Sequence, residues 1–172
     1  MLFRSAIVKF EEALALDPNL KLGPEAEAKK LAAEALVSDG RKLAKDGKIE
    51  QALAKFSEAQ ALSSEAKIVA KEWNNLCWHG SLWGHAADVL DACGRAVELE
   101  RNNGRIRDSR GLARALTGDY AGAIEDFQFF VEWAQEYELD KEYRVQREAW
   151  IAELEAGRNP FDAETLEELK NK

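Results

Sequence analysis

The sequence predicts an all-α protein in which helical hairpins follow one another along the chain. One observation is that apolar and small residues recur with the period of a helix that buries one face. An example is the run Trp73, Leu76, Cys77 and Gly80. A second observation is that a group of residues beginning with glycine returns at a nearly fixed interval, which is typical of repeat proteins. Only three of the 172 residues are proline, so little interrupts the helices.

The repeated group consists of a glycine turn, a small residue and a residue that fills the space beside it. The last copy contains Gly118, Ala123 and Phe127. Earlier copies are Gly84, Val89 and Cys93, 34 residues upstream, and Gly47, Ala52 and Phe56, a further 37 residues upstream. A partial copy, Ala6, Phe10 and Ala13, ends at Pro18. Each unit is therefore two helices joined at a glycine.

These residues resemble the tetratricopeptide repeat (TPR) family, whose signature over 34 residues is W-x2-L-G-x2-Y, then A-x3-F, then P. The clearest unit runs from Trp73 to Gly80; it keeps the tryptophan and Leu76, whereas Cys77 replaces the glycine and Gly80 the tyrosine. The resemblance covers roughly residues 1–137. It implies a solenoid of about three complete repeats with a leading half-repeat and a C-terminal cap.

We expect a single domain over residues 1–172. Its predicted parts are a half-repeat at 1–20, hairpins at 24–66, 70–103 and 104–137, and capping helices at 139–172. No breaker except Gly40 lies between Glu25 and Asp46, which predicts one helix of about 22 residues and about 33 Å. Small residues such as Gly40 and Gly111 should let paired helices approach Phe56 and Phe127.

The predicted cap is a charged helix with an apolar face formed by Tyr143, Trp150, Ile151 and Leu154. Gly157 and Pro160 should end it, and Asp162 should cap a short last helix that folds back on the array. Phe129 and Trp133 are expected beneath this cap, near Tyr143 and Trp150. The alternative is that they form an exposed aromatic patch, which would mark a partner surface.

The start of the sequence falls inside a repeat, which suggests a piece of a longer protein whose incomplete first repeat could self-associate. The segments 111–133 and 159–162 are also similar to the C-terminal repeat tails of large bacterial multidomain signalling ATPases. That resemblance implies an alternative function as an assembly or sensing module.

Composition and charge exclude several other classes. A net charge of -8 disfavours binding to nucleic acid or to an acidic membrane surface. No apolar stretch approaches the roughly 20 residues of a membrane span, and no signal peptide is visible. We therefore expect a cytoplasmic protein, in which the two cysteines are free thiols.

The family resemblance implies a concave groove, lined by the first helix of each hairpin, that binds a peptide or partner protein. Carried over residue by residue, the groove positions are Arg41, Lys45, Lys71, Asn74, Asn75, Trp78, Arg105, Asp108 and Leu112. Their basic and aromatic character favours an acidic partner. The carboxylate clamp of some family members is matched only at Asn75 and Arg105. We expect an adaptor or scaffold rather than an enzyme.

Two groups of residues allow more than one interpretation. Arg107, Arg110 and Arg114 could add to a positive face, or could pair with neighbouring carboxylates. Cys77, His79, His85 and Cys93 are residue types that bind metals or act as nucleophiles. Cys77 and His79 are two residues apart on a helix and point to different faces, whereas Cys77 and Cys93 occupy the two packing positions of one hairpin. We therefore expect no metal, no cofactor and small packed cysteines, with a cysteine-dependent enzyme as a remote alternative.

Overall fold

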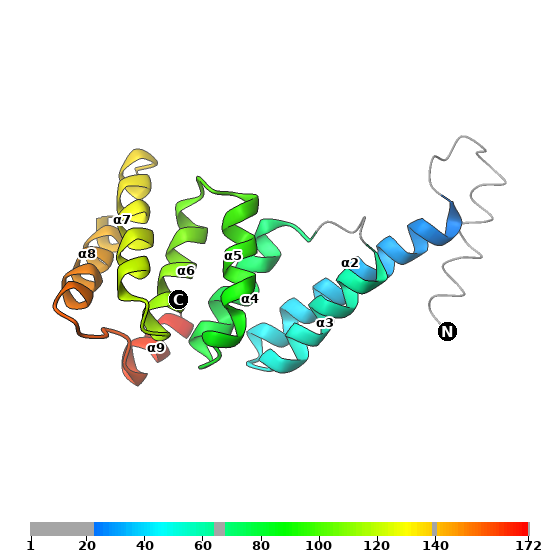
Figure 1. Ribbon diagram of the computed structural model, residues 1–172, viewed down its shortest axis with the longest axis horizontal. Coiled ribbons are helices and arrows are strands. Elements are labelled where there is room, and N and C mark those ends of the chain that lie inside the picture. Colours follow the sequence, from blue (N-terminus) through cyan, green and yellow to red (C-terminus); the bar gives the residue numbers. More distant parts are fainter. Residues whose placement is uncertain (1–22, 64–67, 139–140, 172) are drawn as a thin grey trace. The chain divides into compact units, whose positions relative to one another are not determined.

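A computed structural model describes residues 23–63, 68–138 and 141–171 (Figure 1). Every regular element in these ranges is a helix, which confirms the all-α prediction. The chain divides into two compact units, residues 1–68 and 69–172, and each is described by itself. The predicted half-repeat at 1–20 lies outside the described residues.

The first unit contains a hairpin of two helices, α2 (Pro24–Lys45) and α3 (Ile49–Leu62). The predicted long helix is confirmed, because α2 has 22 residues. Close packing of α2 on α3 depends on Gly40: a Cβ added there would lie 2.8 Å from the ring of Phe56. Phe56 is itself only 1% exposed, so it fills the space that the glycine leaves.

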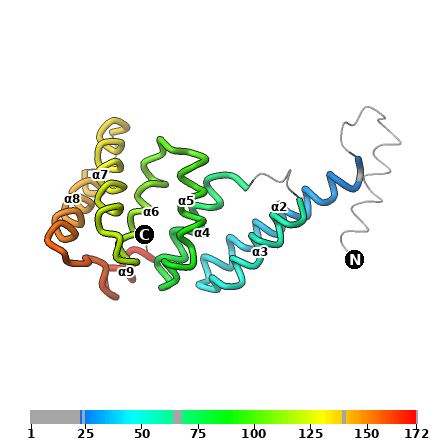
Figure 2. Tube along the Cα trace, in the orientation of Figure 1, coloured from blue at the N-terminus to red at the C-terminus, as the bar shows by residue number. Residues whose placement is uncertain are grey.

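The second unit contains six α-helices and one 3-10 turn among its described residues (Figure 2). In chain order they are α4 (Ala70–Leu82), η1 (Ala87–Val89), α5 (Leu90–Leu99), α6 (Gly104–Leu116), α7 (Tyr120–Glu136), α8 (Lys141–Glu155) and α9 (Ala163–Lys170). Helix α4 packs on α5 and α6 packs on α7, while α4 also contacts α6. Helix α8 covers α7, and α9 returns to contact α4.

Four helices, α2, α4, α6 and α8, each end in a turn of the same type. The glycines Gly47, Gly84, Gly118 and Gly157 have φ of 74°, 83°, 87° and 74°, which a residue with a Cβ adopts only at a cost. In each turn the next backbone N–H donates to a carbonyl near the end of the helix, for example Asp119 to Arg114 at 2.9 Å. Helix α8 therefore ends in the same way as α2, α4 and α6.

The core of the second unit is built around Phe127, which is fully buried. A Cβ on Gly111 would lie 2.8 Å from its ring, so the predicted match of a small residue with this phenylalanine is confirmed. The Trp150 ring lies 5.5 Å from that of Phe127, and the Phe161 ring lies 4.8 Å from that of Trp150. Leu169 of α9 joins the same cluster, so the last helix folds back as predicted.

Phe129 and Trp133 do not lie where they were expected. The ring of Phe129 lies under the guanidinium of Arg107, and Trp133 stacks on Tyr137 at 4.8 Å. Phe129 follows Phe127 by two residues, a rotation of about 200° around a helix, so the two rings leave α7 in nearly opposite directions. Phe127, and not Phe129, packs against Trp150 of α8.

Candidate functional site

Side chains of α4, α6 and α8, with one from α7, surround a cavity of about 270 Å³ in the second unit. Amides, guanidinium groups and aromatic rings dominate its wall. The lining residues are Asn74, Asn75, Trp78, Arg105, Asp108, Ser109, Phe130, Tyr143 and Arg147. Phe130 reaches the cavity from α7.

Three helices each contribute a cavity residue at the same distance from the turn that ends the helix. Asn74, Asp108 and Arg147 each lie ten residues before the turn glycine of their own helix, which is Gly84, Gly118 or Gly157. Equal distances from the same kind of turn place these three side chains at the same level and on the same face of each helix. They therefore converge on one cavity.

A buried ion pair forms one wall of the cavity. Arg147 of α8 donates through Nε to Oδ1 of Asp108 at 2.9 Å and through Nη2 to Oδ2 at 2.7 Å. The guanidinium also lies over the rings of Phe130 and Trp150, at 5.1 and 4.5 Å from their centroids. The opposite charges balance, so this pair joins α8 to α6 without adding net charge to the cavity.

Other lining groups are available to a ligand. The Arg105 side chain is exposed and has no hydrogen-bond or ion-pair partner among the described residues. Oδ1 of Asn74 is buried and also lacks a partner. Trp78 is half-buried and Tyr143 is 49% exposed, so both offer ring surface. The cavity thus offers one uncompensated positive charge, amide groups and aromatic faces.

Ser109 is the only hydroxyl of the lining that could act as an alcohol nucleophile. Its Oγ donates to the backbone carbonyl of Arg105 at 3.1 Å, not to a side-chain base. An activated serine needs an adjacent base that accepts its proton. This arrangement suits binding better than nucleophilic catalysis.

The C-terminal segment covers the adjoining part of the same helix faces. Phe161 and Leu169 pack in one buried cluster with Leu82 of α4, Leu112 of α6 and Leu154 of α8. These three helix residues lie one to two turns beyond the cavity residues of their helices. Leu112 is 1% exposed, so its expected role as a groove residue is wrong: the chain's own C-terminal segment occupies that position.

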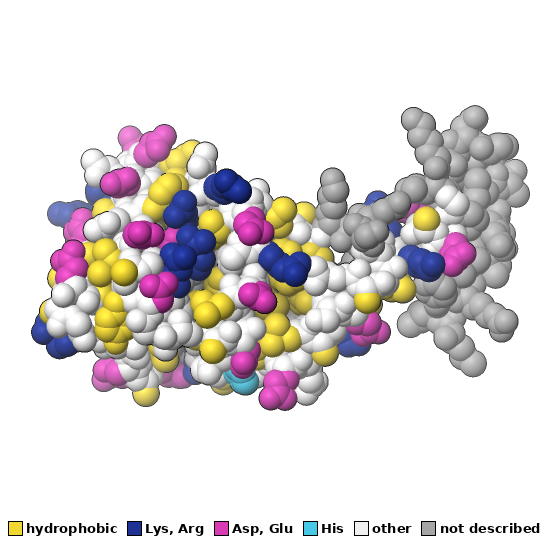
Figure 3. All heavy atoms as spheres, in the orientation of Figure 1, with side chains coloured by type: hydrophobic (Ala, Val, Ile, Leu, Met, Phe, Trp, Pro, Cys, Tyr) yellow, Lys and Arg dark blue, Asp and Glu magenta, His cyan; other side chains and the backbone are white. Residues whose placement is uncertain are grey.

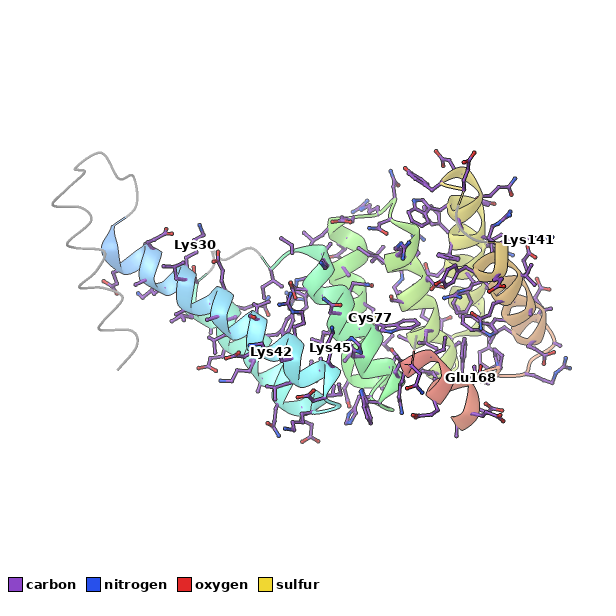
Figure 4. All side chains as sticks on the ribbon, turned by 180° about the vertical axis from the view of Figure 1, so that it is seen from behind. Lys30, Lys42, Lys45, Cys77, Lys141 and Glu168 are labelled. Carbon is purple, nitrogen blue, oxygen red and sulfur yellow. A yellow bond between two sulfur atoms is a disulfide. The ribbon has the colours of Figure 1, made fainter. Side chains whose placement is uncertain are left out.

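The structure brings together five of the nine predicted groove residues around the cavity, namely Asn74, Asn75, Trp78, Arg105 and Asp108. Lys71 is exposed on α4 but is not part of the lining. Arg41 lies on α2 in the first unit and is half-buried. Lys45 lies on the same helix and is exposed (Figure 4). Asp108 is held by Arg147 and is therefore not free for a ligand.

Sequence reasoning missed Tyr143 and Arg147 as cavity residues, because it treated the helix after residue 140 only as a cap. It also missed Phe130, because α7 was expected to supply packing residues and not the lining of a site. A signal was present in Gly157, which is the fourth turn glycine of the chain. Counting back from it, as for Gly84 and Gly118, leads directly to Arg147.

Asp126 tests the interpretation in which the α6 arginines pair with a carboxylate. This carboxylate of α7 is fully buried, and all three arginines contact it. Arg110 donates to both of its oxygens at 2.7 Å, Arg107 to Oδ1 at 3.3 Å and Arg114 to Oδ2 at 3.0 Å. The interpretation in which the arginines pair with a carboxylate is confirmed.

Cys77 of α4 and Cys93 of α5 form a disulfide, so the prediction of two free thiols is wrong (Figure 4). Both residues are fully buried, in the packing positions that the repeat assigns to them. Those positions face each other across one hairpin, with Cα atoms 4.9 Å apart, and this proximity allows the bond. In the bonded form neither sulfur is available as a nucleophile or a metal ligand.

No protein-family model matches the chain, and no curated protein matches it. Within the described residues, no group of three or more His, Cys, Asp and Glu side chains is placed to hold a metal ion. In the same part of the chain, no helix has the length and apolar character needed to cross a membrane.

Proposed function

We propose that the chain is a tetratricopeptide-type repeat module that binds a peptide segment of a partner protein between α4, α6 and α8, without catalysing a reaction. Two features support this function. The first helices of successive hairpins end in the same glycine turn, and they supply most of the wall of one cavity. Repeat proteins commonly bind their partners on such a surface, formed by equivalent helices.

The observation that carries the proposal is the buried Oδ1 of Asn74, which has no hydrogen-bond partner. A buried acceptor without a donor costs free energy, so such an atom in a cavity wall points to a missing donor. The backbone N–H of a bound peptide is a donor of suitable size. Asn75 lies beside it on α4, and its amide can donate to a peptide carbonyl.

The charges of the cavity favour an acidic peptide. Arg147 is neutralised by Asp108, whereas Arg105 has no carboxylate partner among the described residues. A glutamate or aspartate of the peptide could therefore pair with Arg105. Trp78 and Tyr143 would contact the apolar parts of the same segment.

A peptide array tests this function. The full chain is applied to an array of 12-residue peptides that contain acidic, neutral or basic positions. We expect a subset of acidic peptides to bind, and we expect Asn75→Ala with Arg105→Glu to abolish their binding. Lys48→Glu, a charge-matched change on an exposed residue of the first unit, should bind the same peptides as the unchanged chain.

The proposal is wrong if no peptide binds, or if the Asn75 and Arg105 substitutions leave the selected peptides bound with equal affinity. Intrinsic fluorescence gives an independent reading, because a peptide in the cavity would contact Trp78. Replacing Trp78 by phenylalanine should then remove most of the fluorescence change that a selected peptide causes.

We also propose a cytoplasmic location, in which the Cys77–Cys93 disulfide of the structure would be reduced, and this difference gives a direct test. Reducing compartments keep most protein thiols unpaired, whereas disulfides persist in oxidising ones. In the cytoplasm, Cys77 and Cys93 should therefore be recovered as thiols when cells are lysed in acid and alkylated at once. Recovery of the bonded form would contradict this location.

A further inference from the structure

Asp126 has more partners than a buried carboxylate needs. Its Oδ1 accepts from Arg107 and Arg110, and its Oδ2 accepts from Arg110 and Arg114. Two hydrogen bonds at each oxygen saturate a carboxylate. The bidentate pair with Arg110 alone would balance the charge of Asp126, so Arg107 and Arg114 bring positive charge in excess.

The excess charge is only partly balanced nearby. Asp119 lies 3.4 Å from Nε of Arg114, but its side chain is 52% exposed, where water weakens the attraction. Like charges held close together repel, which makes a cluster of three guanidinium groups unfavourable without additional negative charge. The cluster is positive in a chain whose net charge is -8.

The arginines keep donors that the protein does not use. Nη2 of Arg107, Nη1 of Arg110 and Nη2 of Arg114 have no hydrogen-bond partner among the described residues. The three side chains are 25%, 17% and 25% exposed, so solvent reaches them. These nitrogens can donate to a ligand without giving up Asp126.

Neighbouring groups hold the guanidinium groups in place. Cζ of Arg107 lies 4.5 Å from the centroid of the Phe129 ring, and Nη1 of Arg114 donates to the carbonyl of Gly122 at 3.0 Å. Arg110 is fixed by its two bonds to Asp126. A ligand would therefore meet donors that are already oriented, which lowers the entropy cost of binding.

This cluster is separate from the cavity. Arg114 follows Arg105 by nine residues, and at about 100° per residue this spacing places the two side chains on opposite sides of α6. The face drawn in Figure 3 carries a group of Lys and Arg side chains over the region of α6 and α7. A ligand of this cluster would therefore not occupy the proposed peptide site.

We propose that Arg107, Arg110 and Arg114 form a binding site for a phosphate group. A phosphate monoester carries close to two negative charges at neutral pH and offers three acceptor oxygens. The three nitrogens without a partner, one on each arginine, match the three acceptor oxygens in charge-assisted hydrogen bonds. The excess charge of the cluster also matches a dianion better than a single carboxylate. The phosphate comes either from a phosphorylated side chain of a partner or from free phosphate.

Nuclear magnetic resonance of the full, 15N-labelled chain in phosphate-free buffer tests this site. The probes are inorganic phosphate, a phosphoserine peptide and the same peptide without phosphate. We expect both phosphate-containing probes to shift the side-chain Nε–H signals of the three arginines, and the unmodified peptide to leave them unchanged. Tighter binding of the phosphopeptide than of phosphate identifies a phosphorylated partner, and equal binding identifies the free ion.

Arg107→Gln with Arg114→Gln keeps the bidentate Arg110–Asp126 pair and should weaken phosphate binding roughly tenfold or more, the loss expected for charge-assisted hydrogen bonds. Lys48→Gln, at an exposed position of the first unit outside both sites, should leave it unchanged. The proposal is overturned if phosphate shifts none of the three signals of the unchanged chain. It is also overturned if a folded double variant binds phosphate as tightly as the unchanged chain does.

Discussion

Arg147 and Asp108 are 39 residues apart in the sequence and are joined by two hydrogen bonds in a buried pair. Removing one partner leaves the other charge buried without compensation, which typically costs about 3–5 kcal/mol. We therefore predict that Arg147→Met lowers the free energy of unfolding by about this amount. Urea denaturation followed by circular dichroism measures it.

Two variants make this test specific. Arg158→Met breaks an exposed pair with Glu153 and should leave the free energy of unfolding nearly unchanged. Asp108→Leu combined with Arg147→Met removes both charges and should recover much of the lost stability. If Arg147→Met is as mild as Arg158→Met, the pair does not hold α8 to α6.

The disulfide should contribute to stability by limiting the unfolded chain. Cys77 and Cys93 are 16 residues apart, and closing a loop of this length stabilises a protein by about 3 kcal/mol in the chain-entropy model. A reducing agent should lower the free energy of unfolding by about that much. Urea denaturation with and without the reductant measures the change.

The double variant Cys77→Ser, Cys93→Ser should not respond to the reductant, which separates the effect of the bond from other effects of the reagent. Native alkylation gives a second reading, because the bonded and buried sulfurs should not react until the protein is reduced and unfolded. Rapid labelling of the unreduced, folded protein would contradict the disulfide.

Much of the helical fold follows from local sequence. The repeat spacing predicts turns at Gly47, Gly84 and Gly118, and their positive φ explains why glycine occupies these positions. The sequence also predicts the packing of Phe127 against Gly111, because a bulky ring needs a small residue on the facing helix.

The candidate site was less predictable, because it depends on which helix faces are buried by segments that lie far away in the sequence. Leu112 has the helical position of a groove residue, but the C-terminal segment buries it. Cys77 and Cys93 were correctly placed in packing positions, yet only the distance across the hairpin reveals that they can bond. The pairing of Arg147 with Asp108 likewise requires knowing that α8 lies beside α6.

Gly111 provides a test of close helix packing. Gly111→Ala would place Cβ 2.8 Å from Phe127, a fully buried ring with little room to move. We predict a loss of about 1–3 kcal/mol in the free energy of unfolding, which is typical of overpacking. The matched control is Gly94→Ala in α5, where nothing lies within 4 Å of an added Cβ.

The control substitution should raise the free energy of unfolding instead of lowering it. Alanine favours a helix over glycine by about 0.5–1 kcal/mol, so Gly94→Ala should stabilise the protein slightly. Thermal or urea denaturation of both variants gives the comparison. Equal effects of the two substitutions would show that α6 and α7 are not in close contact at Gly111.

The stability that the N-terminal cap gives to α9 should depend on pH. Oδ1 of Asp162 accepts a hydrogen bond from the backbone N–H of Thr165 at 2.8 Å. This bond, with a further one from the Thr165 side chain, lowers the pKa of Asp162. Because the folded pKa lies below the unfolded one, the cap stabilises α9 fully above the unfolded pKa. Its contribution is lost as pH falls through the folded pKa.

We therefore predict that α9 loosens from the cluster around Leu169 only in acid, below about pH 4. A 13C titration of the Asp162 carboxyl group should give a midpoint below the ordinary value of about 3.9. Asp162→Asn keeps an acceptor for the Thr165 N–H at every pH, so α9 amide signals in that variant should lack this transition. A midpoint at or above the ordinary value would mean that Asp162 does not cap the helix in solution.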